Sequence, residues 1–174
     1  MRDLASHVLT KAPARFALGG LSMGGYVAYE IMRLAPERVT RLVTMGSPAH
    51  ADTPEQRQRR LALLQLARSG KFKGVTPRLL PLLLHPDHLN NPAVTQPILD
   101  MAARVGPQGF ERQQTAMMHR IDSRPHLRLI SCPTLIIAGA QDQLFPLPGC
   151  PGNRFAHSEG AAGDYRTMRA FAAA

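Results

Sequence analysis

The pentapeptide Gly-Leu-Ser-Met-Gly at residues 20–24 decides how this chain is interpreted. The short apolar stretch before it, residues 15–19, predicts a buried strand. After it, over residues 25–35, apolar side chains recur at the three- and four-residue spacing of a helix. The sequence therefore predicts a strand and a helix joined by a sharp turn at Ser22.

A G-x-S-x-G pattern between a strand and a helix is typical of a nucleophile elbow, a turn that strains the serine backbone and exposes its Oγ. We expect the absence of a side chain at Gly20 and Gly24 to let the strand and the helix approach each other closely. The backbone N–H of Met23, at the N-terminus of the helix, is placed to hold an oxyanion. The alternative is a glycine-rich turn with a bystander serine, which the flanking strand and helix disfavour.

The remaining pattern predicts one partial core and one inserted helical segment. A β-branched strand at residues 39–45 follows the helix by a short link, and a strand–helix–strand unit of this kind implies a parallel sheet. A helix is predicted at residues 2–11, and another strand at residues 130–139. Between the strands, residues 51–125 are interpreted as a helical lid, with residues 1–50 and 126–147 as the core. The lid helices are predicted at residues 55–69, 77–84, 97–104 and 110–120.

Composition limits the classes of function. The net charge is +9, but the basic residues are scattered, aromatic residues make up only 5% and there is no Trp, so solvated helix faces are favoured over a nucleic-acid interface. No apolar run approaches the roughly 20 residues of a membrane span. The N-terminus lacks a signal-peptide pattern, and Cys132 and Cys150 do not make a disulfide framework. We therefore expect a cytoplasmic protein without nucleic-acid or membrane partners, and leave its oligomeric state open.

Three segments, residues 18–25, 36–43 and 132–142, resemble the α/β-hydrolase superfamily, in particular its serine-nucleophile esterases, lactonases and acyl hydrolases. The resemblance implies an α/β fold class: an incomplete α/β-hydrolase parallel sheet with a helical lid inserted between strands. It also implies a small acyl substrate, no cofactor, Ser22 as the nucleophile and Asp142 as the acid of a Ser-His-Asp triad. The family places a lid over its acyl pocket, where residues 51–125 lie in this sequence.

Several alternatives remain open. The Gln-Asp pair ending at Asp142 is also a plausible turn former, although its place after a parallel strand favours the acid role. An acyltransferase or a carbon–carbon hydrolase would use the same triad, because the fold does not fix the chemistry. A catalytically dead fragment or a small basic binding protein is the rival from another class. The pair His85 and His88 with Asp87 lacks further ligands nearby, so no metal site is expected.

The chain departs from the family pattern at both ends. The family has four strands before the elbow strand, with the second oxyanion donor among them, whereas one predicted helix precedes it here. We therefore expect an N-terminal truncation and an open sheet edge, which is an aggregation hazard.

The base histidine is the other departure. Residues 148–174 show no helix or strand periodicity, and His157 is the one histidine after Asp142. A shift of the reading frame by one nucleotide from Pro148 onward permits Cys-Gly-His near the end, with the histidine at position 170. We interpret this tail as irregular and frameshifted, and the chain as impaired because its base is absent.

Overall fold

The computed structural model describes residues 1–69, 77–139, 141–144 and 165–169. The chain divides into two compact units, one made of Met1–Ala51 with Arg120–Ala174, and the other of Asp52–His119. The segment 120–125, which the sequence pattern assigns to the lid, belongs to the first unit. The reason is local bonding: the Ser123 N–H donates to the carbonyl oxygen of Ala49 at 2.8 Å, and Arg120 Nη2 donates to that of His50 at 3.1 Å.

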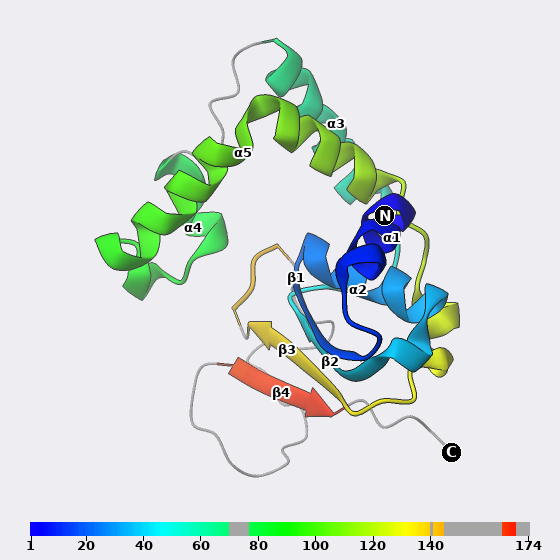
Figure 1. The fold of residues 1–174 in the computed structure, drawn as a ribbon. Coiled ribbons are helices and arrows are strands. Elements are labelled where there is room, and N and C mark those ends of the chain that lie inside the picture. Colours follow the sequence, from blue (N-terminus) through cyan, green and yellow to red (C-terminus); the bar gives the residue numbers. More distant parts are fainter. Residues whose placement is uncertain (70–76, 140, 145–164, 170–174) are drawn as a thin grey trace. The chain divides into compact units, whose positions relative to one another are not determined.

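A four-stranded sheet organises the first unit, in the order β1 (Phe16–Leu21), β2 (Val39–Met45), β3 (Thr134–Gly139) and β4 (Tyr165–Arg169) (Figure 1). Strands β1, β2 and β3 are parallel, and β4 runs antiparallel to β3. The parallel sheet predicted from the strand–helix–strand pattern is confirmed.

Strand β4 differs from the sequence-based expectation. Residues 148–174 lack a strand pattern, yet residues 165–169 pair with β3 along most of its length. Backbone hydrogen bonding to an available strand edge does not require an alternating side-chain pattern, which explains why periodicity missed it. The rest of this tail, including Cys150 and His157, lies outside the described residues.

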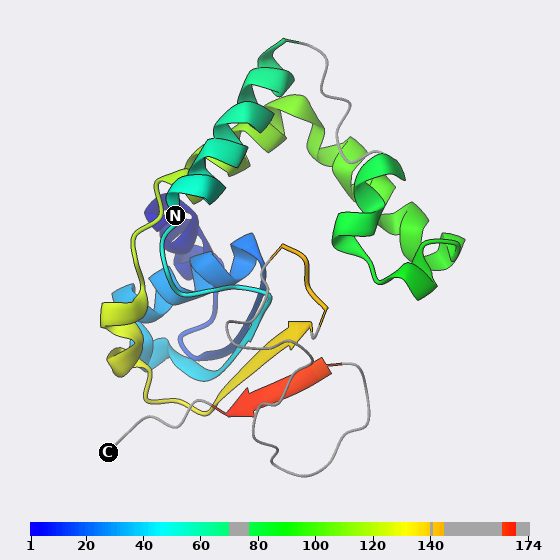
Figure 2. The same ribbon diagram turned by 180° about the vertical axis from the view of Figure 1, so that it is seen from behind.

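Helix α2 (Met23–Leu34) packs on strands β1 and β2, and helix α1 (Arg2–Lys11) packs on α2; Figure 2 shows them from behind. The two helices and β2 form a buried apolar cluster, against which Phe16 and Leu18 of β1 pack. The cluster is made of Ala5, Ala28, Ile31, Met32, Val39 and Leu42. Two 3-10 segments, η1 (Pro36–Arg38) and η4 (Arg124–Leu129), complete the described elements of this unit. The core therefore lies between α2 and the two strands β1 and β2, next to the turn that joins β1 to α2.

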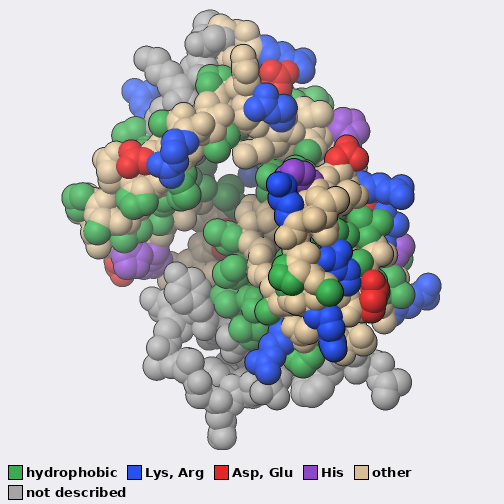
Figure 3. Space-filling model, in the orientation of Figure 1, with side chains coloured by type: hydrophobic (Ala, Val, Ile, Leu, Met, Phe, Trp, Pro, Cys, Tyr) green, Lys and Arg blue, Asp and Glu red, His purple; other side chains and the backbone are tan. Residues whose placement is uncertain are grey.

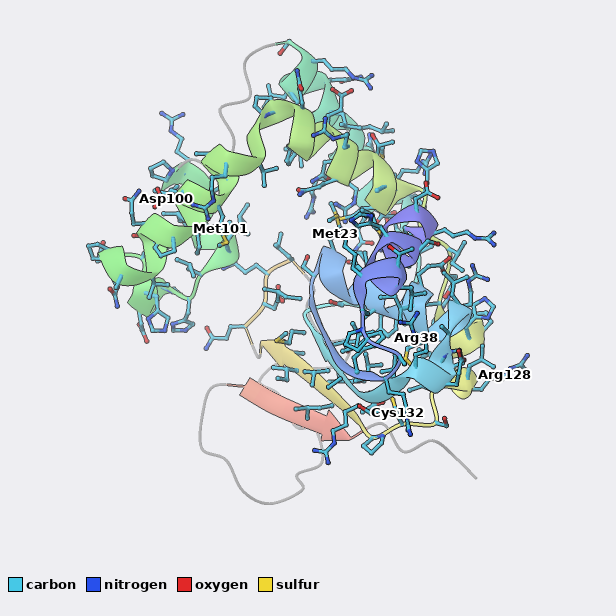
Figure 4. All side chains as sticks on the ribbon, in the orientation of Figure 1. Met23, Arg38, Asp100, Met101, Arg128 and Cys132 are labelled. Atoms are coloured by element: carbon cyan, nitrogen blue, oxygen red, sulfur yellow. The ribbon has the colours of Figure 1, made fainter. Side chains whose placement is uncertain are left out.

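Arg38 secures the link between α1 and β1 (Figure 4). Its guanidinium donates to four backbone carbonyl oxygens at 2.7–3.2 Å, those of Leu9, Ala12, Pro13 and Ala14. It also lies 5.6 Å from the ring centroid of Phe16. One side chain thus satisfies the carbonyl groups left over where the helix ends.

Strand β1 is less buried than the sequence suggested. Ala17, Gly19 and Leu21 are exposed, and Leu21 keeps 66% of its surface. The expectation of a buried strand was wrong for these positions, because alternate residues of a strand share one face and this face of β1 is left uncovered by the described residues. Among the described residues β1 also pairs with β2 alone. The open edge expected from the sequence is present in the described structure.

The unit Asp52–His119 is built of helices: α3 (Pro54–Arg68), η2 (Pro77–Leu79), α4 (Leu80–Leu83), η3 (Pro86–His88) and α5 (Pro92–Met118). The two helices expected at residues 97–104 and 110–120 are joined in α5, which breaks at Gly106 (φ 64°) just before Pro107. Within the parts of the chain that the structure describes, no helix is long and apolar enough to cross a membrane.

The first and last turns of this unit are bonded to each other. Arg60 Nε lies 2.8 Å from the Asp52 carboxylate, and Arg60 Nη1 donates to Gln114 Oε1 at 2.8 Å. Arg57 Nη1 donates to the carbonyl oxygen of Met118 at 3.1 Å. Helices α3 and α5 are therefore fastened side by side at the root of the insertion.

Candidate active site

Ser22 occupies the single residue between β1, which ends at Leu21, and α2, which begins at Met23. Its backbone has φ 50° and ψ −114°, and within the described residues it is the one non-glycine residue with positive φ. Such a conformation costs about 1–3 kcal/mol and persists only where the surroundings impose it. The chain thus turns from strand to helix at one strained serine, as the pentapeptide predicts.

Neighbouring backbone groups hold this turn on both sides. The Ser22 N–H donates to the carbonyl oxygen of Met45, at the end of β2, over 2.8 Å. The Ser22 carbonyl oxygen accepts from Gly25 N–H at 3.0 Å and from Ser47 Oγ at 2.9 Å. Residues at the end of β2 and just after it therefore form hydrogen bonds with both the N–H and the carbonyl group of Ser22.

Two glycines allow the close approach, but they are not the two expected. A Cβ at Gly20 would overlap the carbonyl group of Gly24, and a Cβ at Gly25 would overlap the Ser47 side chain. A Cβ at Gly24 would meet nothing within 4 Å. The expectation that Gly24 must be small for packing was wrong, because the Ser47 side chain reaches the helix one residue further on.

Met23 is the first residue of α2 (Figure 4). The N–H groups of the first helical turn have no partner within the helix, and they carry the positive end of its dipole. The backbone N–H of Met23 therefore lies directly after Ser22, at the electropositive end of the helix.

The sheet register brings Ser22 and Asp142 to the same edge. Leu21 pairs with Met45, and Met45 pairs with Ile137, so the carboxyl ends of the three parallel strands lie in one row. Ser22 follows β1 directly. Asp142 follows β3 in a turn, where its backbone N–H donates to the carbonyl oxygen of Gly139 at 3.3 Å. This is the edge at which parallel sheets keep their sites.

The carboxylate of Asp142 has two environments. Oδ1 accepts from the Leu144 N–H at 2.9 Å, which is the kind of bond that a turn-forming aspartate makes. Oδ2 lies on the side of Gly46, where a Cβ added to that glycine would come within 3.6 Å of it. One oxygen orients the carboxylate within its own loop, and the other faces the end of β2.

Tyr29 supports the segment between these residues. Its hydroxyl donates to the carbonyl oxygen of Ser47 at 3.0 Å and lies 3.4 Å from Thr44 Oγ1. Burial raises the pKa of Tyr29, so the phenol stays protonated and remains a donor at neutral pH. Sequence reasoning missed Gly46, Ser47 and Tyr29; the one available signal was that Gly46 and Ser47 end the second strand.

Three of the described histidines, His50, His85 and His119, have polar side-chain contacts within their own segments. His50 Nδ1 lies 2.7 Å from the Ala51 carbonyl oxygen, and His119 Nδ1 lies 2.8 Å from that of Thr115. His85 Nδ1 lies 3.3 Å from the carboxylate of Asp87. In the described part of the chain, no group of three or more His, Cys, Asp or Glu residues is arranged to hold a metal ion.

Charged side chains are spread over the surface. On the face that Figure 3 shows, Lys and Arg side chains stand in separate places among apolar and acidic ones. This distribution agrees with the scattered basic residues of the sequence.

Comparison with known proteins adds independent findings. No family model matches the chain. Among curated proteins, the pimeloyl-(acyl-carrier protein) methyl ester esterase of Pectobacterium atrosepticum is 31% identical over an alignment of 158 positions, which covers 84% of this chain and 59% of that protein.

Solved structures are similar as well. An esterase from Thermogutta terrifontis superposes with a TM-score of 0.67 and 31% identity, over 82% of this chain and 52% of that one. The enol-lactonase from Burkholderia xenovorans shares the fold, with a TM-score of 0.63 and 24% identity over 77% of this chain and 50% of that one. The chain spans about half to three fifths of the length of these proteins.

Proposed function

Because this chain belongs to the α/β-hydrolase superfamily, we propose that it carries a serine-hydrolase site for a small ester, lactone or related acyl compound. The observation that carries the proposal is the strained backbone of Ser22 at the sheet edge where Asp142 also lies. A strained serine between a parallel strand and a helix is the setting of an exposed nucleophile.

Each residue has a role in the proposed acyl transfer. The Ser22 hydroxyl attacks the carbonyl carbon, and the Met23 N–H stabilises the oxygen that becomes negatively charged. A histidine takes the serine proton, while Asp142 orients the ring and stabilises its charged form. The bond to the alcohol group then breaks, the histidine gives its proton to the departing alcohol, and the acyl group stays on Ser22. Water attacks that acyl group, with the histidine again taking a proton, and the acid is released as the Ser22 hydroxyl is restored.

The relatives suggest the class of substrate. The curated relative is named for a methyl ester, and the 31% identical solved structure is an esterase. We assign to this chain a carboxylic ester with a small alcohol group. The role of residues 51–125 as a lid is part of the same proposal. Within the helical unit, Leu82, Leu83, Met101 and Val105 are exposed apolar side chains.

The base limits the rate in the proposed mechanism. A serine hydroxyl is a weak nucleophile, and general-base catalysis typically contributes about 10²–10⁴-fold. His157 is the one histidine after Asp142, and it lies outside the described residues. Imidazole added to the solution supplies the same base chemically, so we expect it to raise a slow basal turnover.

The test combines turnover with covalent labelling. Hydrolysis of p-nitrophenyl acetate and butyrate is measured with and without imidazole, for the unsubstituted chain and for Ser22→Ala and Asp142→Asn. Imidazole-dependent turnover that Ser22→Ala removes supports the proposal, as does a fluorophosphonate adduct located on Ser22 by mass spectrometry.

Two results would contradict it. If imidazole raised the hydrolysis rate equally in the unsubstituted chain and in Ser22→Ala, the increase would come from catalysis by imidazole in solution. Absence of any adduct on Ser22 in the presence of imidazole would favour the catalytically dead fragment or the small basic binding protein instead.

A further inference from the structure

We propose that Gly46 and Ser47, at the end of β2, are positioning residues that set Ser22 and Asp142 relative to each other. The inference rests on the roles proposed above for those two residues. Ser47 donates a hydrogen bond to the Ser22 carbonyl oxygen, and Gly46 lies where an added Cβ would come within 3.6 Å of the Asp142 carboxylate.

Ser47 acts on the nucleophile side. Its Oγ lies 2.9 Å from the Ser22 carbonyl oxygen and 2.7 Å from that of Met45, so its single proton lies between two acceptors. Its side chain also packs against Gly25, where any Cβ would overlap it. Since Met45 accepts the Ser22 N–H, the segment 45–47 restrains the serine backbone in its strained conformation.

Gly46 acts on the acid side. Its N–H donates to the Ile137 carbonyl oxygen of β3 at 2.9 Å, which fixes it to the strand that leads to Asp142. Its own φ is +51°, a conformation that favours glycine, and a Cβ there would stand 3.6 Å from Asp142 Oδ2. A side chain at this position would therefore strain the turn and would stand in van der Waals contact with the Asp142 carboxylate.

The turn is anchored from a third element. Tyr29 of α2 donates its hydroxyl to the Ser47 carbonyl oxygen at 3.0 Å. The positioning residues are thus bonded to the elbow, to β3 and to α2. A displacement of Ser22 relative to Asp142 has to break one of these bonds, which is why the turn sets the geometry.

Amide hydrogen exchange tests the structural half of the proposal without any need for activity. In Ser47→Ala we expect the Ser22 and Tyr26 amides to exchange about five- to tenfold faster, the effect of losing one hydrogen bond. Ser47→Cys, which keeps the size, and Ser47→Thr, which keeps the hydroxyl, bracket the change. Ser69→Ala is the matched control, because it removes a hydroxyl bond to the Leu66 carbonyl oxygen (2.9 Å) in the helical unit.

Kinetics under imidazole rescue test the catalytic half. We expect Ser47→Ala to lower kcat about ten- to a hundredfold with KM unchanged, because misplacement of a nucleophile affects the chemical step. Gly46→Ala should lower kcat in the unsubstituted chain and have no further effect in Asp142→Asn. Gly106→Ala introduces comparable backbone strain (φ 64°) into open space, so its effect should be the same in both backgrounds.

The outcomes separate the two proposals. If the unsubstituted chain shows no Ser22-dependent turnover, the proposed function fails, while hydrogen exchange still decides whether Ser47 holds the elbow. Unchanged exchange at Ser22 in Ser47→Ala overturns the inference. So does a Gly46→Ala effect that is fully additive with Asp142→Asn in a chain that does turn over ester.

Discussion

The guanidinium of Arg120 lies 4.2 Å from the ring centroid of Tyr26, and its Nη2 donates to the His50 carbonyl oxygen at 3.1 Å. Arg120 is the first residue after the helical unit, and His50 lies two residues before that unit begins at Asp52. Tyr26 lies one turn beyond Ser22 on α2. One buried cation therefore fastens both connections of the insertion to the helix that follows the proposed nucleophile.

We predict that Arg120→Ala lowers the free energy of unfolding by about 2–4 kcal/mol, because a desolvated cation–π contact and a charged hydrogen bond are lost together. Arg120→Lys should recover only part of this, since an ammonium group lacks the planar stacking surface. Urea unfolding monitored by circular dichroism measures the effect. Arg68→Ala, at an exposed ion pair with Glu111, should cost at most about 1 kcal/mol, and equal losses in the two variants would refute the prediction.

The two glycines of the pentapeptide should respond differently to the same substitution. Gly20→Ala places a Cβ into the carbonyl group of Gly24, so we expect a loss of about 3 kcal/mol or no folded protein at all. Gly24→Ala meets open space within a helix and should be neutral or stabilising by up to about 1 kcal/mol. Thermal unfolding of the pair provides the comparison, and a Gly24→Ala variant as unstable as Gly20→Ala would show that the assignment is wrong.

Glu30 and Arg33 predict a specific dependence of stability on pH. Arg33 Nη2 lies 2.6 Å from Glu30 Oε1, and this pairing lowers the pKa of the buried Glu30 carboxylate. A depressed folded-state pKa gives stability that is fully present above the unfolded-state value of about 4.3 and is lost as pH falls through the folded value. Glu30→Gln should therefore flatten the loss of stability below about pH 4.3 in a urea series. Glu37→Gln, which removes an exposed carboxylate, is the control for the change in net charge.

The open edge of β1 should promote self-association. Unpaired strand edges recruit other strands, and charged side chains on the edge oppose this. Ala17→Lys, at an exposed position of β1, should lower the light scattering of concentrated samples. Ser6→Lys adds the same charge on the exposed face of α1, and an equal fall in scattering there would mean that net charge alone is responsible.

The reading frame of the tail is open to a direct test. We expect the gene, read one nucleotide downstream from codon 148, to encode Cys-Gly-His with the histidine at position 170. A chain with that tail should hydrolyse esters without imidazole, about 10²–10⁴-fold faster than the present one, and replacing the new histidine by Ala should abolish the gain. Any other codons at these positions end the frameshift hypothesis.

Local patterns carried much of the fold. The helix Arg2–Lys11 and the strand–turn–helix around Ser22 were predictable, because apolar spacing and the pentapeptide are short-range signals. The break within α5 was also anticipated, but as two helices rather than one chain bent at Gly106.

What could not be predicted depends on contacts between distant segments. Gly25, rather than Gly24, has no room for a Cβ, because the Ser47 side chain lies against it. The sequence alone does not give the register of the strands, so it does not show which residue of the helix Ser47 will meet. The pairing of residues 165–169 with β3 has the same origin. Gly46 and Ser47 escaped notice for this reason too, although they stand beside both proposed catalytic residues.

The bonds at the root of the helical unit bear on the order in which the chain folds. Strands β2 and β3 are neighbours in the sheet, yet the whole unit lies between them in the sequence, so their pairing must close a long loop. The hydrogen bonds of Arg57 and Arg60 hold the two ends of that unit together in the folded structure, so they would close most of this loop without the strands. If the helical unit folds first, it acts as a short connection between β2 and β3, and we expect the stability of this unit to affect the rate at which β3 joins the sheet.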